Sequence, residues 1–215
     1  MPKSKRVKVV SLTKTGRKDK DFKTAAISTI RDNVENFSNI FVFSFENMRT
    51  AVFKDVRIAL NDSKIFLGKN KVAQVALGKS EEDEYRSELR RVSAQLKGDS
   101  GLIFTERTKE NLEEYFSQLK FADYARAGVI PRETIVIKPG PLEFPGDMLD
   151  QLRKLGMVVE IDNGVVVLRT EFRATTKGSP LTPEQAKVLI HMGKKLSVFR
   201  VSLKCAWKDG DFKML

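Results

Sequence analysis

The sequence is poor in the residues that build disulfides and metal sites. Among 215 residues it has one cysteine, Cys205, and one histidine, His191. A single cysteine cannot form an intramolecular disulfide, which favours a reducing compartment such as the cytosol or the nucleus. One Cys and one His also fall short of the ligand sets that transition metals prefer, so no metal or other cofactor is expected. We expect Cys205 to be a small core residue and His191 to lie at or near the surface of a helix.

Long apolar runs are missing as well. No stretch approaches the roughly 20 apolar residues that a membrane-spanning helix needs. The N-terminus, Met1-Pro2-Lys3-Ser4-Lys5-Arg6, is not followed by the apolar segment of a secretory signal. We therefore expect no membrane partner. Hydrophobic residues still make up 41% of the chain, enough to bury a sizeable core.

Acidic residues are the scarcer charge, with 28 Asp and Glu against 39 Lys and Arg, for a formal net charge of +11. This imbalance favours a polyanionic partner, with nucleic acid first and an anionic membrane surface second. Residues 1–20 form a basic arm in which Asp19 is the single acid, and its basic residues are Lys3, Lys5, Arg6, Lys8, Lys14, Arg17, Lys18 and Lys20. An arm so poor in apolar residues is expected to become ordered on a partner.

Helical and strand patterns alternate in the first half of the chain. Apolar spacing predicts helices at residues 22–37, 47–60, 72–76, 80–97 and 108–119, and β-rich runs predict strands at 40–45, 64–67 and 101–104. The strand at 40–45 is apolar at nearly every position, so we expect it to be buried on both faces. Asn47 is expected to cap the second helix and Glu81 to Glu84 to open the fourth. The alternation predicts an α/β fold, a layered domain with a mixed, partly parallel sheet.

The pattern changes after Pro131, where prolines and glycines interrupt the chain. We expect a strand at 134–137, a helix at 147–155, a hairpin at 158–168 that turns at Asp162-Asn163-Gly164, and a helix at 183–192. A last strand at 197–203 is expected to return to the first domain. The predicted organisation is a basic arm (1–20), an α/β domain (21–129 and 194–215) and an inserted small α+β domain (130–193).

One segment resembles a phosphate loop but departs from its pattern. Residues 73–80, Ala73-Gln74-Val75-Ala76-Leu77-Gly78-Lys79-Ser80, have alanine where G-x-x-x-x-G-K-[ST] has its first glycine, and they are predicted to be helical. Phosphate binding needs that glycine and a loop after a strand. A small phosphate-loop ATPase is therefore a minor alternative, and we expect the chain not to be an enzyme.

Basic groups from separate segments predict an anion-binding surface. Gly68-Lys69-Asn70-Lys71 stands where a strand ends and a helix begins, so helix amides and two lysines could hold a phosphate; a solvated turn is the alternative. Arg49, Lys54 and Arg57 are expected on the preceding helix, where they could share a broad face. Exposed aromatics are not concentrated near these groups. We therefore expect recognition of folded RNA by shape rather than by base stacking.

Several short segments resemble the ribosomal stalk-base family of acidic P-zero proteins. They are Ile65-Phe66-Leu67-Gly68-Lys69-Asn70 with the apolar helix behind it, Gly98 to Thr105, and Ala125-Arg126-Ala127-Gly128. Residues 1–6, 68–78, 139–143 and 181–186 resemble the assembly-factor branch of that family more specifically. The segments are short, but the resemblance extends over nearly the whole chain in their order and spacing.

The resemblance implies a ribosome assembly factor that binds large-subunit rRNA at the GTPase-associated centre of pre-60S particles and holds the site until the stalk protein replaces it. The alternative is a mature structural stalk-base protein, but this chain ends at Leu215 without the helices and acidic tail expected of one. The implied partners also include the neighbouring stalk-base ribosomal protein and a dual-specificity-phosphatase-like release factor. The implied location is the nucleus and nucleolus, with cytoplasmic shuttling. The predicted RNA contacts are Lys5, Arg6, Lys8, Lys14, Arg17, Lys18, Arg49, Lys54, Arg57, Lys69, Asn70, Lys71 and Arg126.

Overall fold

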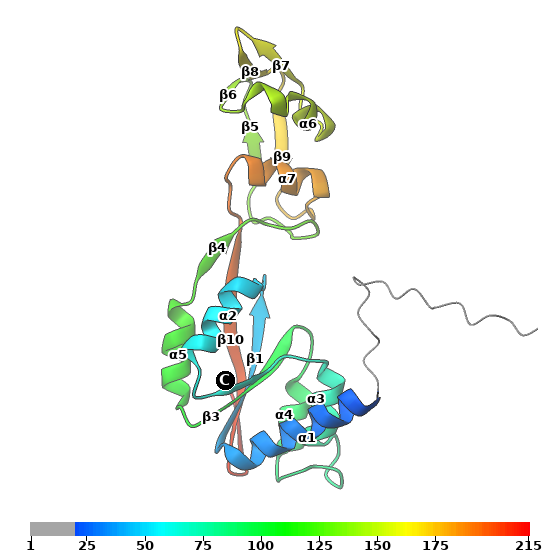
Figure 1. Ribbon diagram of the computed structural model, residues 1–215, viewed down its shortest axis with the longest axis vertical. Helices are drawn as coiled ribbons and strands as arrows, with labels where there is room; N and C mark the ends of the chain where they lie inside the picture. Colours follow the sequence, from blue (N-terminus) through cyan, green and yellow to red (C-terminus); the bar gives the residue numbers. More distant parts are fainter. Residues whose placement is uncertain (1–19) are drawn as a thin grey trace, which may run out of the picture. The chain divides into compact units, whose positions relative to one another are not determined.

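The computed structural model describes residues 20–215 (Figure 1). The predicted contacts in the basic arm, from Lys5 to Lys18, lie outside the described residues. In chain order the elements are α1 (Lys20–Asn36), β1 (Asn39–Glu46), α2 (Thr50–Ala59), β2 (Lys64–Phe66), α3 (Asn70–Leu77), α4 (Leu89–Gln95), β3 (Ser100–Thr105), α5 (Lys109–Gln118), β4 (Phe121–Asp123), β5 (Ile135–Ile137), β6 (Gly140–Leu142), the 3-10 helix η1 (Gly146–Met148), α6 (Leu149–Lys154), β7 (Val159–Asp162), β8 (Val165–Leu168), β9 (Phe172–Thr175), α7 (Pro183–His191), β10 (Ser197–Lys208) and β11 (Asp211–Met214).

The described chain forms two compact units. The first unit contains the residues up to Ser44, Asp55–Glu113 and Ser202–Leu215, and the second contains Phe45–Lys54 and Glu114–Val201. The units are therefore interleaved in sequence, and the chain passes from one to the other within β1, α2, α5 and β10. The domain boundaries expected from the sequence stay a prediction.

The main sheet has the strand order β11-β10-β1-β3-β2, and β4 pairs with the first residues of β10. The predicted parallel pairing is wrong, because the paired strands of the described chain are antiparallel. Ile40 of β1 faces Phe104 of β3, and Ile65 of β2 faces Ile103 of the same strand. β1 and β2 thus run in the same direction, as a strand–helix–strand unit predicts. However, β3 lies between them and runs opposite to both.

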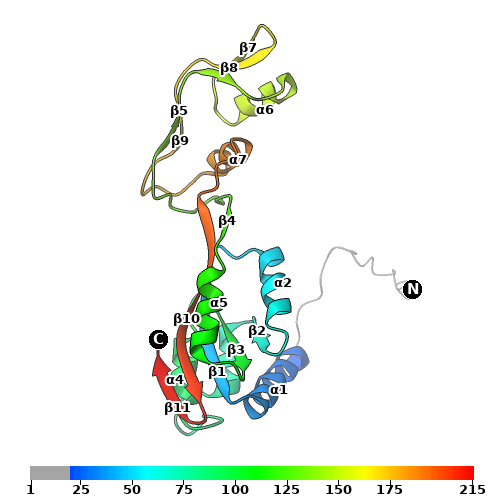
Figure 2. The ribbon, with the colours of Figure 1, turned by 90° about the vertical axis from the view of Figure 1, so that its left-hand side faces the viewer.

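The core of the first unit lies between this sheet and three helices, α1, α3 and α4, which are labelled in Figure 1; Figure 2 shows α1 and α4 from the side. Ile30 and Val34 come from α1, and they are completely buried. Ile40 and Val42 of β1 belong to the same core. Phe41 and Phe43, which alternate with them along the strand, are buried as well, at 3% and 1% exposure. Because successive side chains of a strand point to opposite faces, β1 is buried on both faces, as predicted.

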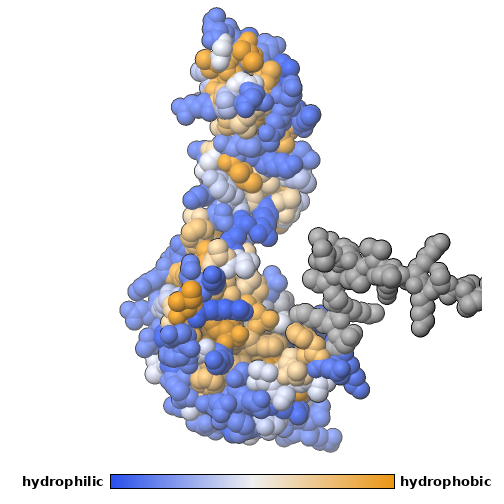
Figure 3. All heavy atoms as spheres, in the orientation of Figure 1, coloured by the Kyte–Doolittle hydropathy of each residue, from blue (hydrophilic) through white to orange (hydrophobic). Residues whose placement is uncertain are grey.

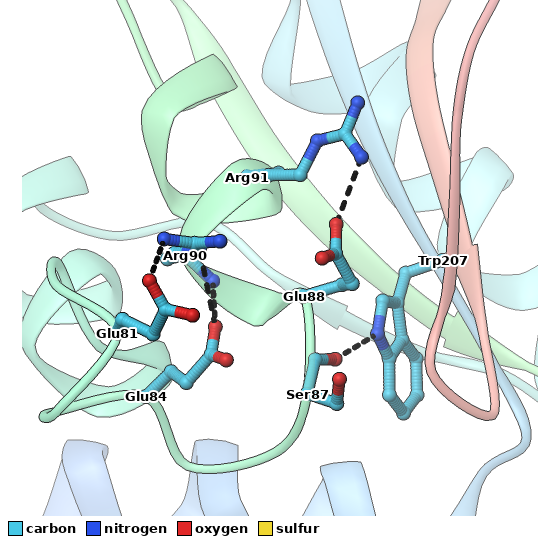
Figure 4. A network of polar contacts seen from close by, with 7 residues as sticks. All are labelled: Glu81, Glu84, Ser87, Glu88, Arg90, Arg91 and Trp207. Carbon is cyan, nitrogen blue, oxygen red and sulfur yellow. Dashed lines mark hydrogen bonds and ion pairs between the residues drawn. The ribbon is translucent and has the colours of Figure 1, made fainter.

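The predicted helix at 80–97 is wrong in its first half. The chain from Lys79 to Glu88 is a loop, and α4 begins only at Leu89 because Glu88 adopts a left-handed conformation with φ 66°. Two of the acids expected in a first helical turn, Glu81 and Glu84, bind Arg90 instead (Figure 4). A Glu81 carboxylate oxygen lies 2.8 Å from Nη1 of Arg90, and Glu84 accepts a bond from the Arg90 backbone N–H at 3.3 Å.

The same loop is attached to the sheet through the single tryptophan. Nε1 of Trp207 in β10 donates a hydrogen bond to the Ser87 carbonyl oxygen at 2.9 Å. The indole is 1% exposed and packs in the core of the first unit. Figure 4 shows Trp207 beside the loop, with Glu88 and Arg91 forming an ion pair above it. A loop with these contacts is an ordered part of the unit, although its sequence pattern predicts a helix.

Asn47 does not cap α2. It has a φ of 52°, the helix begins three residues later at Thr50, and the Asn47 amide nitrogen donates to the Val198 carbonyl oxygen at 3.1 Å. Asparagine tolerates left-handed backbone better than most residues, which suits it to this turn. On the first turn of α2, Phe53 is buried and Val52 is only half-buried.

The second unit contains two small sheets, β5-β9 and β6-β8-β7, with α6 and α7. The predicted hairpin is confirmed: β7 and β8 pair antiparallel and turn at Asn163 and Gly164, whose φ values are 49° and 82°. Two positive φ angles are what a tight two-residue hairpin turn requires. α7 begins at Pro183, as predicted, and Thr182 and Gln185 form a capping box at its start.

Cys205 is a core residue, as predicted. It is completely buried, and this burial raises the pKa of its thiol to about 11. His191 is half-buried at the end of α7, where its Nε2 lies 3.2 Å from the Gln151 side-chain nitrogen.

Candidate nucleic-acid interface

The turn between β2 and α3 presents two lysines at the start of a helix. Lys69 precedes the first helical residue and has extended backbone, with φ −70° and ψ 120°. Its carbonyl oxygen accepts bonds from the backbone N–H groups of Val72 and Ala73, which starts the helix. The Lys69 side chain forms no capping bond at this helix end, and the side chains of Lys69 and Lys71 are exposed. A helix N-terminus with two exposed cations attracts anions.

Asn70 positions this turn. Its amide nitrogen donates to the Gly98 carbonyl oxygen at 2.8 Å, which joins the first residue of α3 to the loop before β3. The adjacent carbonyl, that of Lys97, accepts a bond from the Lys204 ammonium group at 3.1 Å. The amide group of Asn70 therefore already has a structural partner, and its predicted RNA contact stays a prediction.

The basic residues predicted on α2 differ from one another. Arg49, just before the helix, forms an ion pair with Asp123 and donates to the Tyr124 carbonyl oxygen at 2.7 Å. Its side chain is only 23% exposed. Arg49 therefore holds the start of α2 beside β4. Lys54 and Arg57 are exposed, and they are three residues apart on the helix, so they lie on neighbouring positions of one face.

The structure brings together some of the predicted residues. Lys69, Asn70 and Lys71 lie within one helical turn of the first unit, which also contains Arg57. Arg49, Lys54 and Arg126 belong to the second unit, where exposed Arg126 lines a small hollow with Arg49. The convergence of all these groups on one surface stays a prediction.

Lys23 is a candidate that the sequence pattern did not single out. It is exposed on the first turn of α1, and it lines the same hollow as Lys69. The two lysines are far apart in sequence and are brought together because α1 packs against α3 in the core. In the sequence, only the position of Lys23 off the apolar stripe of its helix indicates that it is exposed.

Figure 3 shows hydrophilic residues over much of one face of the molecule, with apolar areas between them.

The segment that resembles a phosphate loop has a different geometry. Ala73 to Leu77 form the last turns of α3, and Gly78 ends the helix with a φ of 100°. A helix C-terminus presents carbonyl oxygens rather than amide groups, so this segment does not make a phosphate cradle.

Residues 20–215 contain neither a metal-ligand cluster nor a membrane-spanning helix. In this part of the chain, His, Cys, Asp and Glu side chains do not gather in any group of three or more that could hold a metal ion. Its helices are each too short or too polar to cross a membrane.

Two protein families match successive parts of the chain. Residues 18–120 match the family described as ribosomal protein L10, and residues 125–193 match the insertion domain found in the 60S ribosomal protein of the same type. The first match contains the β2–α3 turn with its lysines. These are families of ribosomal and ribosome-associated proteins rather than of enzymes.

Curated relatives extend the match to the full chain. The "Ribosome assembly factor mrt4" of Dictyostelium discoideum is 38% identical over all of this chain and 96% of its own length. The protein of the same name from Neurospora crassa is 38% identical, with 96% of this chain and 90% of its own covered. The mature "Large ribosomal subunit protein uL10" of Oxybasis rubra is 23% identical, over 83% of this chain and 56% of its own. Identity and coverage thus favour the assembly factors over the mature stalk protein, and this chain belongs to the mrt4 family of ribosome assembly factors.

Proposed function

We propose that this protein binds large-subunit rRNA on pre-60S particles, at the GTPase-associated centre, and occupies the stalk-base site until the mature stalk protein replaces it. The observation that carries the proposal is the β2–α3 turn. Lys69 and Lys71 are exposed at a helix start, inside the region that matches ribosomal protein L10. Phosphate contacts of this kind position a protein on RNA.

The mechanism is mutual exclusion between two similar proteins. The assembly factor and the stalk protein share the L10-like region, so each would occupy the same RNA surface. Which one is bound then depends on their relative affinities and concentrations. The protein acts by binding, and no chemical step is needed. We also propose, from the family resemblance, contact with the neighbouring stalk-base ribosomal protein, release by a dual-specificity-phosphatase-like factor, a nuclear and nucleolar location, and cytoplasmic shuttling.

The test is a salt titration of binding to a GTPase-centre rRNA fragment. The double reversal Lys69→Glu with Arg57→Glu should abolish binding, because it places negative charge where phosphates would lie. Lys69→Ala should weaken binding and lower the slope of log affinity against log salt by about 1. The matched control is Lys154→Glu with Lys187→Glu, which makes the same change in net charge at exposed positions of the second unit.

Thermal melting followed by circular dichroism should show that all variants remain folded. Binding by the Lys69–Arg57 double variant that equals wild-type binding at every salt concentration would contradict the proposal. Equal losses in this variant and in the control variant would show a general charge effect, and would contradict a specific surface at the β2–α3 turn.

A further inference from the structure

A hollow next to the β2–α3 turn has the size of one aromatic ring. Its volume is about 150 Å³, and apolar side chains make most of its wall: Phe22 of α1, Phe66 of β2, and Leu67 and Val72 near the start of α3. An apolar cavity of about 150 Å³ is large enough to hold a benzene ring. This hollow is open to solvent on one side, so a flat ring could enter it from a bound molecule.

The shape of the hollow depends on Gly68. A Cβ atom at this position would lie 2.5 Å from Cζ and 2.9 Å from Cε1 of Phe66. The Phe66 ring therefore lies directly against the Gly68 backbone, and a side chain at position 68 would push it away. The glycine thus keeps one aromatic wall in place immediately before Lys69, the first of the two lysines.

The second aromatic wall, Phe22, is exposed beside Lys69, so the expectation that exposed aromatics are absent from the neighbourhood of the basic groups is wrong here. Phe22 has 55% of its surface accessible to solvent, which is high for so large an apolar side chain. Two lysines, Lys23 and Lys69, line the same hollow. An aromatic surface with cations around it suits a ligand that combines a flat ring with negative charge. An unpaired nucleotide has this chemistry, because its base stacks on aromatic side chains while its phosphates bind lysine.

We propose that an unpaired nucleobase of the bound RNA inserts into this hollow, against Phe22 and Phe66, with the flanking phosphates on Lys23 and Lys69. The inference rests on the proposed function and deepens it, since it adds a base contact to recognition by shape and charge. It also separates two roles at one site. The lysines contribute the salt-dependent part of the affinity, and the aromatic wall contributes a part that salt does not screen.

The test uses the full chain and the GTPase-centre rRNA fragment. Phe22→Ala should weaken binding between about fivefold and about a hundredfold, the range expected for loss of one stacked base. The salt slope should stay at the wild-type value, because no phosphate contact is lost. Phe22→Trp should retain affinity. Phe121→Ala is the control, because Phe121 is also exposed, at 45%, and does not line the hollow. It should bind as wild type does.

A spectroscopic measurement identifies the base. 2-Aminopurine is placed in turn at each unpaired position of the fragment, and one position should change its fluorescence on binding the wild-type protein but not on binding Phe22→Ala. Wild-type affinity in Phe22→Ala, or a fluorescence response that does not depend on Phe22, would overturn the inference while the RNA-binding function stands. Failure of the wild-type protein to bind the fragment would overturn both.

Discussion

Gly78 gives the sharpest prediction about stability, because replacing it with alanine should cost free energy for two separate reasons. Gly78 ends α3 with φ 100° and ψ 151°, a conformation that side chains with a Cβ adopt only at a cost of about 1–3 kcal/mol. A Cβ at this position would also overlap Cα of Glu84 and would lie 2.5 Å from the Asp83 carbonyl oxygen. Both atoms are backbone, so the loop itself must move, and overpacking of this kind typically costs about 1–3 kcal/mol more.

The sum is a loss of roughly 2–6 kcal/mol in the free energy of unfolding for Gly78→Ala. Gly98 provides a matched control in the same unit. Its φ is also positive, at 65°, but a Cβ there would meet nothing within 4 Å. Gly98→Ala should therefore lower the free energy of unfolding only through its unfavourable backbone conformation, by about 1–2 kcal/mol.

Urea unfolding followed by circular dichroism, with linear extrapolation to water, measures both values. Gly78→Ala should lower the midpoint clearly more than Gly98→Ala, with similar slopes. Equal losses for the two variants would refute the argument, because they would mean that the loop at Asp83 and Glu84 moves aside freely. They would also weaken the view that the contacts of Arg90 and Trp207 hold this loop.

Two further predictions concern single side chains. Thr182→Ala removes the hydroxyl that accepts the capping bond of α7, and it should lower the free energy of unfolding by about 1 kcal/mol. Thr182→Ser keeps a hydroxyl and should retain most of this stability. Equal unfolding midpoints for the two variants would contradict the capping role. Cys205 should make stability fall as the pH rises, because the unfolded thiol loses its proton near 9 whereas the folded thiol keeps it up to a pKa of about 11. Between about pH 8 and about pH 10.5, the free energy of unfolding measured in urea should therefore fall more for wild type than for Cys205→Ala. An identical fall in the two proteins would rule out ionisation of Cys205 as the cause.

Several features follow from local sequence alone. The hairpin turn at Asn163-Gly164 needs only two residues that tolerate positive φ, and the start of α7 needs only Thr182, Pro183 and Gln185. β1 is apolar at successive positions, so its burial on both faces is also visible in the sequence. Local conformational preference and burial decide these features, and the sequence carries both.

The sheet order and the composition of the candidate site depend on contacts between distant residues. β3 lies between β1 and β2, which makes the pairing antiparallel although the helix–strand alternation looks like that of a parallel sheet. Arg49 forms an ion pair with Asp123, a partner that no local sequence pattern indicates.

The sequence by itself determined the excess of positive charge, the family membership and the lysines at the start of α3. The tertiary structure decided which cations are exposed there, and it brought Lys23 and Phe22 beside Lys69 and Phe66. The physical reason is that charge and backbone preference are properties of single residues or short segments. A hollow, in contrast, exists only where elements far apart in the chain pack against one another, and here α1 packs against α3.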